Sequence, residues 1–65
     1  MNRLEQIREY NRSLDAANIN AANARHLAGV AYAHGNFKLA DAMEREAERH
    51  DANQAYFNRL IAEIA

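Results

Sequence analysis

The side chains of this chain that could do chemistry are three histidines, nine carboxylates and a single serine, Ser13. Glu46 and His50 are four residues apart, so on a helix they share one face and form half of a metal site. A metal site needs further ligands from another segment, but the residues expected opposite this pair are alanines. No histidine falls beside Ser13 to activate it as a nucleophile. We therefore expect no metal, no cofactor and no enzymatic activity.

The composition argues against several other classes of protein. The 65 residues include no cysteine, which excludes disulfides and thiolate zinc sites. Eight basic and nine acidic residues leave a formal charge of -1, whereas a nucleic-acid-binding domain is usually strongly basic. The apolar runs are much shorter than the roughly 20 residues that span a bilayer, and no signal-peptide core opens the sequence. We expect a cytoplasmic protein without a membrane segment or a small-molecule substrate.

The residue pattern that must position these groups is helical throughout. The chain has no proline, only two glycines and many alanines, and its apolar residues recur at spacings of three and four. Asn2 followed by Glu5 resembles a capping box, and Gly35 with Asn36 is typical of a helix end followed by a new N-cap. The sequence predicts one all-α domain over residues 1–65, with helices at about 2–34 and 37–64 and a turn at 35–36.

Two stripes with a seven-residue repeat predict how these helices meet. The first comprises Ile7, Tyr10, Leu14, Ala17, Ala21, Ala24, Ala28 and Ala31. The second comprises Ala40, Met43, Ala47, His50, Gln54, Phe57, Ile61 and Ile64. Folding the chain back at Gly35-Asn36 places Ala31 opposite Ala40 and Ile7 opposite Ile64 in a single register. This pattern predicts an antiparallel hairpin with an alanine-rich heptad seam.

Two polar residues, His50 and Gln54, fall inside this seam. A buried histidine is a candidate pH switch, and a polar seam residue can fix register or oligomeric state. Alternatively, the small alanines opposite leave room for hydrogen bonds and water. Three asparagines between residues 18 and 23 could interrupt the first helix, but the repeat continues through them, so we expect one continuous helix. Gly29 lies on the outer side of the first helix. It is either a tolerated surface glycine or a position where a second chain approaches the backbone closely.

Large apolar residues remain outside the seam. Those that we select as a protein interface are Leu27, Val30, Tyr32, Leu39, Tyr56 and Leu60. Five of them, all except Tyr32, fall on one flank in the heptad pattern. Because an alanine seam buries little area, this apolar flank should be covered. We expect a homodimer that forms a four-helix bundle, with a different protein partner as the alternative.

The function that we expect is that of a small non-enzymatic regulator or adaptor acting through this apolar flank. Its size suggests a bacterial, phage or plasmid accessory factor. The alternative is nucleic-acid binding through Arg8, Arg12 and Arg25 along the first helix. The size and hairpin plan are similar to those of the small plasmid Rop proteins, which dimerise into four-helix bundles and bind paired RNA loops. The resemblance implies a dimer and an RNA-binding alternative; no motif of that family transfers a site residue.

Overall fold

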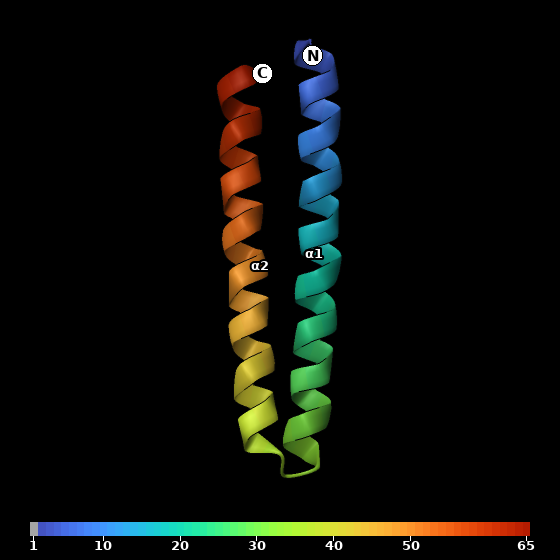
Figure 1. Ribbon diagram of the computed structural model, residues 1–65, viewed down its shortest axis with the longest axis vertical. Helices are drawn as coiled ribbons and strands as arrows, with labels where there is room; N and C mark the ends of the chain where they lie inside the picture. The colour runs from blue at the N-terminus through green and yellow to red at the C-terminus, as the bar shows by residue number, and fades with distance from the viewer. Residues whose placement is uncertain (1) are drawn as a thin grey trace.

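The computed structural model describes residues 2–65, which form two antiparallel α-helices joined by a short turn (Figure 1). Helix α1 spans Arg3–Ala33 and helix α2 spans Phe37–Ile64. The molecule measures 49 × 14 × 13 Å, so it is little longer than one helix and about as wide as two. The predicted two-helix hairpin is confirmed. Neither helix is both long and apolar enough to cross a membrane.

Side-chain caps and one glycine fix where the helices begin and end. The Asn2 Oδ1 accepts a hydrogen bond of 2.8 Å from the backbone N–H of Glu5, which makes Asn2 the N-cap of α1. Gly35 has a φ of 76°, a left-handed conformation that glycine adopts at little cost. The Asn36 N–H donates to the Ala31 carbonyl at 2.8 Å and the Gly35 N–H to that of Tyr32 at 3.0 Å, which completes a Schellman motif.

Asn36 also begins the next helix, which explains why the turn is so short. Its Oδ1 accepts from the Leu39 N–H at 3.2 Å, so the residue that closes α1 is the N-cap of α2. The chain therefore reverses over residues 34–36, which include the predicted turn at Gly35-Asn36 and the C-cap His34. The two chain ends consequently lie at the same end of the molecule (Figure 1).

Helix α1 continues without a break through its asparagines. Asn18, Asn20 and Asn23 are all exposed, while Ala17, Ala21 and Ala24 between them are buried. The amides can therefore be solvated or hydrogen-bonded without entering the seam. The modest helix propensity of asparagine is offset because the alanines, strong helix formers, keep the same heptad positions on both sides. The alternative in which these asparagines interrupt the first helix is thus excluded.

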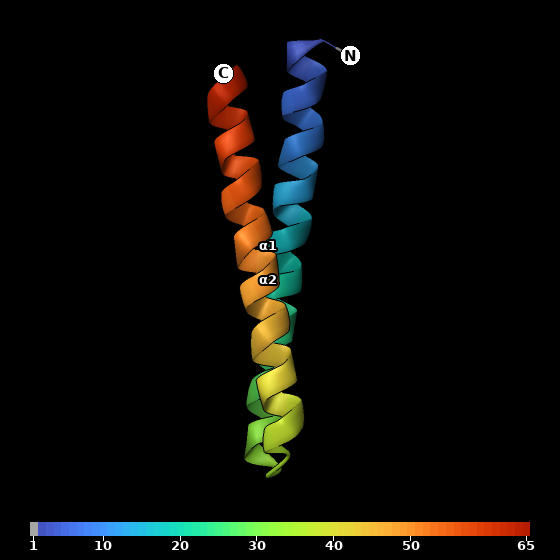
Figure 2. The same ribbon diagram turned by 60° about the vertical axis from the view of Figure 1, so that its left-hand side comes forward.

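The seam follows the predicted register. Every residue of the two predicted stripes is buried or half-buried. The fully buried ones are all alanines: Ala17, Ala21, Ala24, Ala28, Ala31, Ala40 and Ala47. Larger seam residues toward the chain ends, such as Leu14 and Phe57, stay half-buried. The two helices lie closer together near the turn than at the opposite end of the hairpin (Figure 2). This difference agrees with the sizes of the seam side chains, which are small near the turn and larger toward the opposite end.

The narrow seam leaves this hairpin with little burial for its size. None of the described large side chains is completely buried. The exposed surface is 4799 Å², whereas a compact monomer of 7.4 kDa exposes about 4,200 Å². A fully buried Leu or Phe contributes about 1.5–3 kcal/mol, and each buried alanine methyl contributes only about a third as much. A single hairpin therefore lacks most of the hydrophobic stabilisation that a globular core supplies.

The two glycines should respond in opposite ways to the same substitution. A Cβ added at either Gly29 or Gly35 would have no atom within 4 Å, so contacts do not decide the outcome. We expect Gly29→Ala to raise the free energy of unfolding by about 0.8–1 kcal/mol, because alanine is the better helix former. We expect Gly35→Ala to lower it by about 1–2 kcal/mol, because a left-handed φ strains an L-residue. Urea unfolding followed by circular dichroism measures both.

A loss of stability in Gly29→Ala that grows with protein concentration would contradict this prediction. It would indicate that a second chain packs directly against the Gly29 backbone.

Candidate interaction surface

The two flanks of the seam carry different chemistry, and the first of them is polar. Its cross-helix contacts join Arg25 of α1 to Asp51 of α2, and Asn18 of α1 to Gln54 of α2. The Gln54 Nε2 donates to the Asn18 Oδ1 at 3.0 Å. The Arg25 guanidinium donates through Nη1 to the Asp51 Oδ1 at 3.3 Å and through Nη2 to the Oδ2, which makes the pair bidentate. We call this side the polar flank.

Charge on the polar flank holds Arg25 in place. The hydrogen bond from Arg25, together with its positive charge, lowers the pKa of the Asp51 carboxyl below its ordinary value, against an opposing effect of desolvation. The same bond, the Asp51 charge and the nearby carboxylates of Glu44 and Glu48 raise the pKa of Arg25. Both side chains of the pair are almost half exposed, so solvent screens their attraction. The contact therefore favours one helix register rather than supplying most of the stability.

Tyr32 belongs to the turn end of this polar flank. Its ring packs edge-on against Phe37, with 5.1 Å between the ring centroids and 69° between the ring planes. Tyr32 borders a hollow that Gly29, Asp41 and Glu44 also line. The predicted interface residues Leu27, Val30 and Leu39 line a different hollow. Tyr32 is therefore separated from Leu27 and Val30 by the seam.

The opposite flank carries an apolar groove near the turn, which we define by Leu27, Val30, Leu39 and Met43. Leu27, Val30 and Leu39 are 52%, 43% and 45% exposed. Ala31 forms part of the floor, and His34 and Asn36 supply polar groups at the turn end. Three branched side chains and a flexible methionine around one groove form the kind of surface that accepts an apolar helix. The structure thus brings together three of the six predicted interface residues.

The other two predicted interface residues on this flank, Tyr56 and Leu60, lie near the chain ends. Tyr56 is 48% exposed and Leu60 is half-buried. The Tyr56 ring contacts Phe57 edge-on at 5.2 Å between centroids, and the Arg59 guanidinium lies 5.8 Å from its centroid. These contacts orient the Tyr56 ring. We call Tyr56 and Leu60 the open-end patch.

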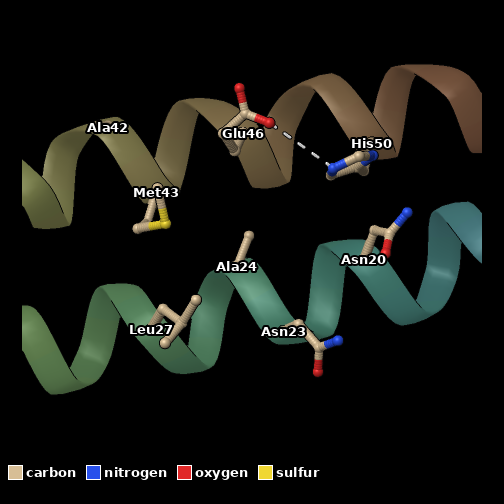
Figure 3. Close-up of a pocket in the computed structure, with 8 residues that line it drawn as sticks. All are labelled: Asn20, Asn23, Ala24, Leu27, Ala42, Met43, Glu46 and His50. Atoms are coloured by element: carbon tan, nitrogen blue, oxygen red, sulfur yellow. Dashed lines mark ion pairs between the residues drawn. The ribbon is translucent and has the colours of Figure 1, made fainter.

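A polar middle separates the apolar groove from the open-end patch. Asn20 and Asn23 of α1 face a hollow there together with Glu46 and His50 of α2 (Figure 3). The His50 Nε2 lies 3.8 Å from the Glu46 Oε2, and the His50 side chain is only 17% exposed. The Arg49 Nη2 donates to the same carboxylate oxygen at 2.7 Å, which lowers the pKa of Glu46. The flank is therefore two apolar areas around a charged centre.

The polar middle does not assemble a metal centre. Across residues 2–65, no three carboxylate or imidazole side chains converge on one point. Alanines occupy the facing seam positions of α1, and Asn20 and Asn23 offer only amides beside them. Gln54, the second polar seam residue, uses its amide to donate to Asn18. Gln54 therefore has a hydrogen-bond partner, whereas the 3.8 Å between His50 and Glu46 is longer than a hydrogen bond.

Of the three arginines predicted as a nucleic-acid strip, two contact carboxylates of the same chain. Arg25 pairs with Asp51 on the polar flank. The Arg12 Nη1 donates to the Glu9 Oε1 at 3.1 Å, and its side chain is 79% exposed. Arg8 is exposed one turn before Arg12. A phosphate would therefore have to compete with carboxylates for two of the three arginines.

No protein-family model, curated protein or solved structure matches this chain. Its function must therefore be argued from the chemistry of its own surface. The most distinctive feature of that surface is the apolar groove, because exposed apolar residues gathered in one place mark interaction sites.

Sequence reasoning missed two parts of this arrangement. Met43 was assigned only to the seam, yet it also forms a wall of the apolar groove. The bond between Arg25 and Asp51 was not anticipated, although each residue directly follows a seam residue, Ala24 or His50. Positions next to an antiparallel seam face each other on the same flank, so this spacing was a usable signal.

The Asp51 contact makes hairpin stability dependent on pH. Because the pKa of Asp51 is lowered in the folded state, its contribution is complete above the ordinary aspartate value of 3.8 and is lost as the pH falls through the lower folded value. We expect Asp51→Asn to lower the urea midpoint at pH 7, and the difference from the original chain to shrink toward pH 2. The matched control is Asp41→Asn, which removes an exposed carboxylate of the same helix. An equal effect of both variants at pH 7 would argue against the contact.

Proposed function

We propose that this protein is a small non-enzymatic adaptor or regulator that acts by binding an apolar helix of another polypeptide in the apolar groove. The observation that carries the proposal is the exposure of Leu27, Val30 and Leu39 around one groove of ≈ 320 Å³. Monomeric proteins rarely leave such a cluster uncovered. The polar flank, by contrast, already pairs its groups within the hairpin.

The surface excess of the hairpin supports the same proposal. The chain exposes about 600 Å² more than a compact monomer of its mass. That excess approaches the roughly 800 Å² that each partner contributes to an interface of ordinary size. A partner helix on the apolar groove would supply the large buried side chains that the alanine seam lacks. We propose that the partner is a second hairpin, so that the two form a homodimeric four-helix bundle.

The test is whether one buried charge removes association. We expect Leu27→Glu to abolish self-association in sedimentation equilibrium, because a carboxylate in the interface loses its hydration without gaining a partner. The matched control is Ile19→Glu, which places the same charge at a residue that is 59% exposed and outside the apolar groove. The control should associate as the original chain does.

Circular dichroism of each variant should show the helical content of the original chain, so that a loss of association is not a loss of folding. Association unchanged by Leu27→Glu would overturn the proposal. Retention of the chain on RNA or DNA that falls steeply with salt, with no association through the apolar groove, would favour nucleic-acid binding instead.

A further inference from the structure

The apolar residues of α2 on this flank are spaced symmetrically around the middle of the helix. Leu39 lies ten residues before Arg49, and Leu60 lies ten residues after His50. Met43 and Tyr56 lie six residues before Arg49 and six after His50. If α2 packs antiparallel on a copy of itself around this midpoint, Leu39 meets Leu60 and Met43 meets Tyr56. The apolar groove of each copy then receives the open-end patch of the other.

Helix α1 has a matching symmetry at the same height. The seam register places Ala21 opposite His50, and the Asn18–Gln54 hydrogen bond agrees with that alignment. His34, at the turn end of the apolar groove, lies twelve residues after Ala22, and Glu9 lies twelve residues before Ala21. The same antiparallel overlap therefore brings the imidazole of one copy near the carboxylate of the other, where an imidazole N–H can donate a hydrogen bond to a carboxylate oxygen.

We propose that a second copy of this chain covers the apolar groove around a two-fold axis that is perpendicular to the hairpin and crosses it at Arg49 and His50. The inference rests on the proposed function and specifies its partner and register. At the axis, the Glu46–Arg49 ion pairs of the two copies lie side by side and can exchange partners, since each pair offers one charge of each sign. In this arrangement the two rods overlap along roughly 42 Å of their 49 Å length, because the axis lies about 14 residues from the turn at 1.5 Å per residue.

Charge argues against the other two-fold arrangement. An axis parallel to the hairpin would place both turns at one end and lay α1 of one copy on α2 of the other. Glu9 would then approach Glu63 of the second copy near the chain ends, because these residues lie at nearly the same height in the seam register. Like charges directly opposed across an interface disfavour a pairing. The perpendicular axis replaces this repulsion with the pairing of Glu9 and His34.

The absence of cysteine from the natural sequence allows a direct test by cross-linking. Three single-cysteine variants are compared with a short bifunctional thiol reagent: Arg49→Cys, Leu39→Cys and Leu60→Cys. Arg49→Cys should cross-link to itself, because a residue beside the axis meets its own copy. Leu39→Cys and Leu60→Cys should each stay largely uncross-linked alone and should form a mixed dimer when combined. The control is Asp15→Cys, on the outer face of α1, which should not cross-link when tested alone or when combined with another variant.

The outcomes separate the register from the function itself. Two results would overturn the proposed axis while the groove remained an interface. One is cross-linking of Leu39→Cys to itself. The other is a mixed product of Leu39→Cys with Val30→Cys and none with Leu60→Cys. The chain could be a monomer in sedimentation equilibrium and still bind another polypeptide, with binding lost in Leu27→Glu. This result would overturn the claim that the partner is a second copy, but not the binding role of the groove. A monomer in which Leu27→Glu changes no interaction would overturn both. Circular dichroism confirms that each cysteine variant keeps its helices.

Discussion

The close approach of two helices along a row of alanines is the constraint on which the rest of this structure depends. Ala47 has no exposed surface, and Ala21 and Ala28 are each 2% exposed, so any larger residue there would force the helices apart. The same small residues bring little apolar area out of water. The seam therefore specifies how the hairpin is aligned but contributes little hydrophobic stabilisation. Within one hairpin, the remainder must come from the turn and the flanks.

The turn and the polar flank both act on alignment. The Schellman motif and the Asn36 cap allow the chain to reverse over residues 34–36, which fixes the height of α2 against α1. Arg25 with Asp51 and Asn18 with Gln54 then favour the same height further along. Because these contacts are exposed and screened, their value lies in selecting one register among several alanine-on-alanine alternatives.

The opposite flank leaves large apolar side chains uncovered in a single hairpin. Its apolar groove and its open-end patch lie on either side of a centre that contains Glu46, Arg49 and His50. Apolar surface on both sides would supply association energy, while the charged centre would penalise any partner or register that left those groups unpaired. In the proposed dimer, a second hairpin would offer the same groups in reverse order, so self-pairing would satisfy both requirements.

The sequence by itself determined the helices, the turn and the seam. Alanine content, caps and Gly35 are local signals, and a heptad stripe read along each helix defines its buried face without any knowledge of its partner. The sequence also indicated that Leu27, Val30 and Leu39 would be left outside the seam. What only the tertiary structure decided is how residues from the two helices combine into surfaces. It added Met43 to the apolar groove and joined Arg25 to Asp51. The physical reason is that a groove or an ion pair between two helices depends on their relative rotation and height, which side-chain packing across the seam sets and no single helix encodes.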